Sequence, residues 1–316
     1  MQQETDTLVR ELDAVARGAV PHQACRACES GRVLADRPDG TVVRHGDAVA
    51  KAHAPDTEVA DHRARLAVAA HPLLADILLP PLPVATGGLG GRPVSAWPYG
   101  APVDPGDPDA APWEEAAALV ARLHRVPPAG LPALPPMRGP AKAARAVARM
   151  RAAGPHAAAG PVLAAWARLP AWARGEAPGP GAAVCHGDVH LGQLVRHPAD
   201  GGPWLLIDVD DLGVGDPAWD LARPAAWYAA GLLAPAVWER FLGAYRAAGG
   251  PAVPADGDPW PRLDVPARAL TVQTAALAVS KSAAEDRDLD EVELCVVDAC
   301  ARIATIPGEL EAEGPS

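Results

Sequence analysis

Residues 185–222, CHGDVHLGQLVRHPADGGPWLLIDVDDLGVGDPAWDLA, constrain the fold more than any other part of this chain. At their centre, residues 204–207 form a continuous apolar run, which is typical of a short strand buried on both faces. Such a strand delivers the next residue, Asp208, to a fixed position. A carboxylate at the end of a buried strand must be paired, hydrogen-bonded or bound to a metal to offset its desolvation. This stretch therefore predicts a polar site built on a buried core.

A second polar group precedes that strand and follows another apolar run, residues 182–185. Gly187 permits a tight backbone turn, and Asp188 is the first carboxylate after it. Gln193 follows five residues later and offers a neutral amide oxygen. Phosphoryl transfer requires one carboxylate to meet a substrate hydroxyl, and a second carboxylate with an amide oxygen to hold a hard cation. The segment supplies all three groups.

Three pieces of this segment occur in a fixed order: HGD with Gln193, then ID, then GDP with DLA. In their order and spacing they resemble the aminoglycoside phosphotransferase family, small-molecule kinases with a protein-kinase-like fold. The resemblance implies that Asp188 is the catalytic aspartate, which orients the acceptor hydroxyl and accepts its proton. It also implies that Asp208 is a ligand of Mg²⁺ and that Asp220 braces the catalytic loop from the following helix.

Gln193 departs from the family pattern, which usually has asparagine at this position. Its side chain is one methylene longer, and octahedral Mg²⁺ tolerates little slack in its ligands. We interpret Gln193 as a second metal ligand, and the alternative is that it only supports the loop through hydrogen bonds. The tetrapeptide HLGQ also resembles the bacterial maltokinase branch of the same superfamily.

Lysine is rare in this chain: Lys51, Lys142 and Lys281 are its only lysines, and arginine is the habitual cation. A lysine kept in such a chain can indicate that an ammonium group is needed. Short β-branched runs separated by turn signals predict three antiparallel strands within residues 31–55, with Lys51 on the third. The resemblance implies that Lys51 holds the α and β phosphates of the nucleotide, and that the turn at residues 36–41 covers them.

Residues 55–58 open a predicted helix, in which a kinase-like protein should offer a carboxylate to the nucleotide lysine. Glu58 and Asp61 are both candidates. Two further strands are predicted at residues 77–84 and 93–97. The segment after them resembles the family's hinge, so the backbone groups of Trp97 and Tyr99 are candidates for contact with adenine, since the intervening proline has no N–H to donate.

Length and charge bound the remaining classes. A chain of 316 residues can form two lobes around sizeable cores. A net charge of −11 disfavours nucleic-acid binding and is compatible with a cationic acceptor. No apolar stretch reaches the length of a membrane span, and the polar N-terminus resembles no secretory signal, so we expect a cytoplasmic protein without a membrane partner. The sequence leaves the oligomeric state open.

We therefore predict an α+β, two-lobed protein-kinase-like fold, with a small sheet-containing N-lobe at residues 1–97 and a mostly helical C-lobe at residues 98–316. The predicted enzyme is a small-molecule O-phosphotransferase that uses ATP and Mg²⁺. Its acceptor is a small hydroxylated molecule, an aminoglycoside-like antibiotic or a related metabolite. The alternatives are a kinase of sugars or other metabolites, and a non-catalytic nucleotide-binding protein, which Gln193 and a phosphate turn with only one glycine would suit.

Overall fold

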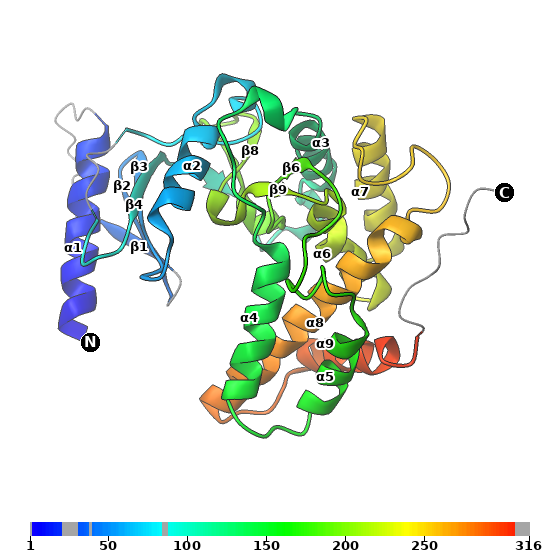
Figure 1. Ribbon diagram of the computed structural model, residues 1–316. Helices are drawn as coiled ribbons and strands as arrows, with labels where there is room; N and C mark the ends of the chain where they lie inside the picture. The colour runs from blue at the N-terminus through cyan, green and yellow to red at the C-terminus, as the bar shows by residue number, and fades with distance from the viewer. Residues whose placement is uncertain (1, 21–30, 38–39, 84–87, 307–316) are drawn as a thin grey trace. The chain divides into compact units, whose positions relative to one another are not determined.

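The computed structural model describes residues 2–20, 31–37, 40–83 and 88–306 (Figure 1). The chain divides into two compact units. The first comprises residues 1–111, 131–135 and 192–210, and the second comprises residues 112–130, 136–191 and 211–316. The first unit thus takes in three stretches that were expected in the C-lobe. The turn expected over the nucleotide phosphates contains residues 38 and 39, which lie outside the described residues.

An antiparallel sheet in the order β1-β2-β3-β4 is the larger sheet of the first unit (Figure 1). Its strands are Arg32–Arg37 (β1), Gly40–His45 (β2), Ala48–His53 (β3) and Val94–Pro98 (β4). Helix α1, Gln2–Ala19, packs against β2 and β3. The side chains of Leu12 and Ala16 bury themselves there against Val43 and Ala50. The three antiparallel strands predicted from residues 31–55 are confirmed.

The strand predicted at residues 77–84 is wrong over its described part, residues 77–83. There, Leu78 and Leu82 form only isolated bridges to neighbouring strands. The physical reason lies in the prolines at positions 80, 81 and 83, which lack the N–H that a continuous ladder needs.

A second, three-stranded antiparallel sheet in the order β5-β7-β8 completes the first unit. Its strands are Ala101–Pro102 (β5), Leu194–Arg196 (β7) and Trp204–Leu206 (β8). Strand β8 is the buried apolar run that the sequence predicts before Asp208. Helix α2, Val59–Ala69, also belongs to this unit, as do the short 3-10 helices η1 (Pro72–Leu74) and η2 (Pro108–Ala110).

The second unit is mostly helical, and α8 is its central helix. Its helices are α3 (Trp113–His124), α4 (Gly139–Ala152), α5 (Ala159–Arg168), α6 (Ala218–Ala229), α7 (Pro235–Ala247), α8 (Trp260–Glu285) and α9 (Glu291–Ile303). Helix α8 packs against α4, α5, α6 and α9, which explains why most of its circumference is buried. The only regular strands of the described part of this unit are β6 (Ala183–Cys185) and β9 (Gly213–Gly215), which pair antiparallel.

None of the helices in the described part of the chain has both the length and the apolar character needed to cross a membrane.

Candidate active site

The first unit contains a pocket of about 450 Å³ with apolar walls and one charged end. Strands β2 and β3 contribute Val42 and Val49 to its wall, and the end of β4 with the segment after it runs along the pocket. Residues 192, 193, 195, 207 and 208 close it. Its polar lining residues include Lys51, Gln193 and Asp208. An apolar slot with a few convergent polar groups is the usual form of a small-ligand site.

Lys51 is the centre of the charged end. It lies on β3 opposite Val42 and Ser95, and its Nζ atom is 2.7 Å from Asp208 Oδ1 and 2.9 Å from Asp210 Oδ2. Burial alone would lower the pKa of Lys51, but the two carboxylates outweigh it and hold the pKa above its ordinary value. The ammonium therefore stays charged, and the rigid sheet fixes its position.

Asp208 follows β8 in the left-handed region of backbone conformation, with a φ of 63°. This conformation is uncommon for a residue with a Cβ and costs on the order of 1 kcal/mol. The next backbone amide upstream, that of Ile207, donates to the Gln193 carbonyl at 2.9 Å, which joins the two predicted metal-binding positions. Their side chains offer a carboxylate and an amide oxygen, a donor set that suits a hard cation such as Mg²⁺.

The two acidic residues considered for the Lys51 partner are engaged elsewhere in the structure. Glu58 caps α2, where its carboxylate accepts from the Ala60 N–H at 3.1 Å. Asp61 lies 3.8 Å from Arg65 one helical turn later. The structure therefore brings neither carboxylate to the lysine.

The hinge residues form one wall of the pocket. The Trp97 side chain is largely buried and its indole N–H donates to Ser95 Oγ at 2.9 Å. Both backbone groups of Tyr99 are used within the unit: its N–H donates to the Asp47 carbonyl at 2.7 Å, and its carbonyl accepts from His197 Nδ1 at 3.0 Å.

Asp188 lies in the second unit, in the loop that follows β6. Gly187 shapes this loop, with a φ of 84°, and a Cβ there would lie 2.5 Å from the Asp211 carbonyl oxygen. Only glycine fits that turn. Asp220 at the start of α6 accepts from the N–H groups of His186 and Gly187 at 2.6 and 2.7 Å. The bracing role that the resemblance implies for Asp220 is confirmed.

A buried neighbour orients Asp220 in turn. His124 places Nε2 at 3.0 Å from its Oδ2 and Nδ1 at 2.8 Å from the Tyr245 hydroxyl. The Tyr245 oxygen also accepts from the Ala252 N–H at 2.9 Å. The loop that carries Asp188 is thus held by a chain of hydrogen bonds that runs from Asp220 of α6 through His124 of α3 to Tyr245 of α7.

Two cations hold the Asp188 carboxylate. Lys142 Nζ, from α4, lies 2.8 Å from Oδ2, and Arg223 Nη2, from α6, lies 2.6 Å from Oδ1. Burial would raise the pKa of Asp188, but these cations outweigh it and hold the pKa well below its ordinary range. Lys142 also lies 2.6 Å from Asp211 Oδ2, and Arg138 lies 3.6 Å from the other oxygen of Asp211.

The sequence alone did not predict the contacts of Lys142, Arg223, Asp210 or His53, all of which contact a predicted site residue or its partner. For Asp210, the sequence raised a contribution to metal binding, with a surface carboxylate as the preferred alternative. One signal pointed to Lys142, because it is one of three lysines in a chain that otherwise uses arginine. The other three carry no such signal, since an arginine, a histidine and a second aspartate beside Asp211 are ordinary surface residues by sequence.

Comparison with known proteins gives a consistent result. The model of a family described as "Phosphotransferase enzyme family" matches residues 41–263. No curated protein matches the chain.

A choline/ethanolamine kinase family protein from Mesorhizobium loti is structurally similar, with a TM-score of 0.60 and 19% identity, covering 96% of each chain. The amicoumacin kinase hAmiN, in complex with AMP-PNP, Ca²⁺ and Ami, gives a TM-score of 0.65 at 14% identity over 98% of each chain. Macrolide 2'-phosphotransferase MphH from Brachybacterium faecium gives 0.51 at 21% identity, covering 96% of this chain and 99% of its own. These solved structures have the kinase-like fold that the sequence predicts.

Proposed function

Because the chain belongs to the phosphotransferase enzyme family, we propose that it transfers the γ-phosphate of ATP to a hydroxyl group of a small molecule. The observation that carries the proposal is the pocket of the first unit, where Lys51 and Asp208 share one end with Gln193. A kinase-type phosphotransferase needs a cation for the phosphates and oxygen ligands for the metal at one end of its nucleotide site. The similar kinase hAmiN was solved with AMP-PNP and Ca²⁺, which supports a nucleotide and a divalent cation here.

The backbone at the end of β4 and directly after it is the proposed contact for adenine. Trp97 pairs with Val49 across the β3–β4 ladder, and the N–H and carbonyl of Tyr99 already have partners. Successive residues of an antiparallel strand direct their backbone groups to opposite sides. This register supports adenine contacts from the Pro98 carbonyl and the Gly100 N–H, with the Trp97 side chain as a wall of the pocket.

Asp208 and Gln193 are the proposed ligands of Mg²⁺, since both offer oxygen atoms to the same pocket. The ion, when bound, would neutralise charge on the nucleotide phosphates. Lys51 would hold the same phosphates from β3. The two contacts together orient the nucleotide and lower the cost of charge that develops on the leaving group.

Asp188 is the proposed base. The acceptor hydroxyl oxygen attacks the γ-phosphorus, its proton passes to Asp188, and the bond from that phosphorus to the bridging oxygen of ADP breaks. Lys142 and Arg223 orient the carboxylate, because each binds one of its two oxygens. They also keep it ionised, so that it can accept a hydrogen bond from the acceptor hydroxyl and orient it.

The charges around Asp188 favour the second candidate acceptor class, a sugar or other metabolite. Lys142, Arg223 and Arg138 surround the two carboxylates of Asp188 and Asp211, which leaves a net positive charge. A polycationic aminoglycoside would meet repulsion there, although the net charge of −11 suits a cation at longer range. A neutral or anionic hydroxylated metabolite would not meet this repulsion.

The test is ADP formation by the purified protein with ATP, Mg²⁺ and a panel of acceptors. The panel contains aminoglycosides, macrolides, choline, neutral sugars and sugar acids, and Asp188→Asn is the control. We expect turnover with a neutral or anionic acceptor that Asp188→Asn abolishes. ATP binding without turnover of any acceptor would support the non-catalytic alternative instead.

A further inference from the structure

Lys51 pairs with Asp210, a carboxylate whose contact with this lysine the sequence does not predict. We propose that Asp210, oriented by His53, positions the Lys51 ammonium for the nucleotide phosphates, the task expected of Glu58 or Asp61 in α2. This proposal rests on the proposed function, because it assigns a residue to the same nucleotide site. Asp210 is a positioning residue, since it acts through the lysine.

Lys51 contacts two carboxylates, and a bound metal ion would change only one of these contacts. Its partner Asp208, at 2.7 Å, is also the proposed metal ligand, so bound Mg²⁺ would compete for that carboxylate. Asp210 lies 2.9 Å from the same ammonium. Asp210 is therefore the partner that remains when the nucleotide and the metal are bound.

A chain of hydrogen bonds holds Asp210. An ionised carboxylate only accepts, so His53 Nδ1, at 2.9 Å from Oδ1, carries a proton. His53 Nε2 is hydrogen-bonded to the Ser95 hydroxyl at 2.7 Å, and Ser95 Oγ accepts from the Trp97 indole N–H at 2.9 Å. The chain runs from the hinge to the lysine through the rigid strands β3 and β4.

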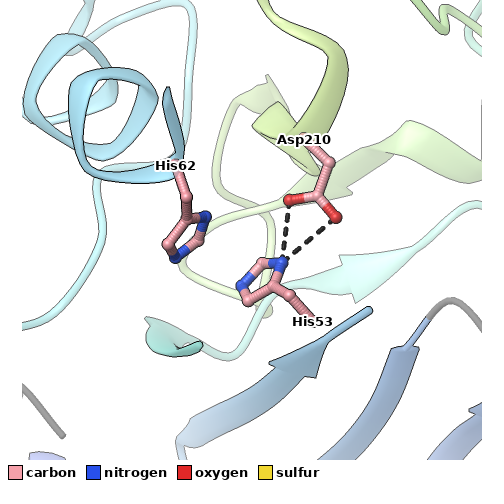
Figure 2. Close-up of side chains that lie close together, drawn as sticks. All are labelled: His53, His62 and Asp210. Atoms are coloured by element: carbon pink, nitrogen blue, oxygen red, sulfur yellow. Dashed lines mark hydrogen bonds and ion pairs between the residues drawn. The ribbon is translucent and has the colours of Figure 1, made fainter. Parts of the chain in front are cut away.

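Helix α2 contributes a histidine ring that packs against this chain of hydrogen bonds. Figure 2 shows His53 facing Asp210, with His62 of α2 beside it. The His53 and His62 ring centroids are 4.1 Å apart at 55°, and His62 is only 4% exposed. Burial lowers the pKa of His62 to about 4, so this ring is neutral at pH 7. The helix thus packs against the chain of hydrogen bonds, and Asp210 makes the ion pair with Lys51.

The same three residues, His53, His62 and Asp210, also bring potential metal-ligand atoms within 4.8 Å of one another. Positioning is the better interpretation for two reasons. The Lys51 ammonium already pairs with the carboxylate that a metal ion would need. Both ring nitrogens of His53 also have protein partners. A Zn²⁺ site is therefore an alternative for the test to detect.

The experiment is a double-mutant cycle with Lys51→Met, Asp210→Asn and the double variant, read out as kcat and KM for ATP. We expect Asp210→Asn to lower kcat/KM for ATP by about 100-fold, because a misplaced positioning group commonly has an effect of that size. The double variant should be no worse than Lys51→Met, since both changes break one unit. Asp76→Asn, at an exposed aspartate of the same unit, is the matched control and should change nothing.

His53 gives a second, independent arm. His53→Asn can keep a donor near the position of Nδ1 and should retain most of the activity, whereas His53→Leu removes the donor and should raise KM for ATP. Thermal unfolding confirms that each variant is folded. If Asp210→Asn does not fold, His53→Leu combined with Lys51→Met decides, and additive losses in that pair would overturn the proposal.

The outcomes separate this proposal from the proposed function. No ATP binding or turnover by the wild type would defeat both. Wild-type turnover with Asp210→Asn within about twofold of it would defeat the positioning role alone. The positioning role is equally overturned if Glu58→Gln or Asp61→Asn, rather than Asp210→Asn, causes the loss. Saturable activation by Zn²⁺ that His62→Ala abolishes would also overturn it in favour of a metal site.

Discussion

Lys51 in the first unit and Lys142 in the second each bridge two aspartates, at 2.7 and 2.9 Å and at 2.8 and 2.6 Å. Their remaining partners differ. His53 completes the Lys51 cluster, so two aspartates face a single lysine there. Arginines complete the Lys142 cluster, so its cations outnumber its carboxylates. The first cluster is short of positive charge and suits a metal cation, whereas the second has an excess and suits an anion.

The difference teaches that the charge balance around a buried lysine, and not the lysine alone, decides what the site can bind. In the proposed function, the negative cluster at the end of an apolar pocket attracts Mg²⁺ with its nucleotide. The positive cluster keeps the Asp188 carboxylate ionised, and its proposed role is to stabilise the phosphate charge that develops during transfer. Three predictions test this division of labour, and a fourth concerns the dependence of stability on pH.

Asp188→Asn should have the largest effect on catalysis. Removal of a general base typically lowers kcat by about 10²- to 10⁴-fold. The affinity for ATP should be unchanged, because the pocket of the first unit does not contain Asp188. Steady-state ADP release and calorimetric titration with ATP measure the two quantities. Weaker ATP binding in this variant would break the proposed separation.

Lys51→Met should mainly weaken nucleotide binding, whereas Asp188→Asn should mainly lower kcat. It leaves the Asp208 and Asp210 carboxylates without their ammonium, and kcat/KM for ATP should fall by about 100-fold, mainly through weaker nucleotide binding. Lys281→Met is the matched control, because that lysine is exposed and lies in neither cluster. An equal loss in both variants would show that the effect is not specific to the site.

Lys142→Met should have a smaller effect, on kcat and not on ATP affinity. It leaves Arg223 on one oxygen of Asp188 and removes the contact at the other, so a loss on the order of tenfold is expected. Lys142→Arg should recover part of it, because the charge is kept. A rise in KM for ATP with unchanged kcat would contradict the assignment of this cluster to the acceptor side of the reaction.

The smallest effect concerns the dependence of stability on pH. Burial lowers the pKa of His62 in the first unit and of His190 in the second to about 4 from 6.5. The unfolded chain then binds protons more readily than the native one, so stability is present above pH 6.5 and is lost as the pH falls towards 4. Chemical denaturation across this window should show that the free energy of unfolding decreases less in His62→Gln than in the wild type, by on the order of 1 kcal/mol. An unchanged slope would contradict the depressed pKa.

The sequence predicted the kinase-like fold because its strongest signals are local. The run before Asp208 marks a buried strand, and β8 ends just before that aspartate, at Leu206. Gly187 marks a turn that only glycine can make, and the structure places it against Asp211. The wrong prediction, a strand at residues 77–84, followed an apolar pattern and gave too little weight to its prolines.

Contacts between distant residues were harder to predict. The partner of Lys51 was sought in α2, because the resemblance implies a carboxylate there, but the structure uses Asp210, which lies far along the chain from Lys51. Likewise, nothing in the local sequence of α4 indicates that Lys142 reaches Asp188. Such pairings depend on tertiary packing, and one sequence carries no sign of them beyond the rarity of lysine.

The most direct test of the central claim, a working nucleotide site in the first unit, is the thermal stability of the protein with ATP, with and without Mg²⁺. A ligand that binds only the native state adds about 2.7 kcal/mol of stability at 100 times its Kd, which is readily seen as a higher Tm. We expect a Mg²⁺-dependent rise in the wild type that persists in Asp188→Asn and disappears in Asp208→Ala. No rise in the wild type, or an equal rise in Asp208→Ala, would contradict the claim.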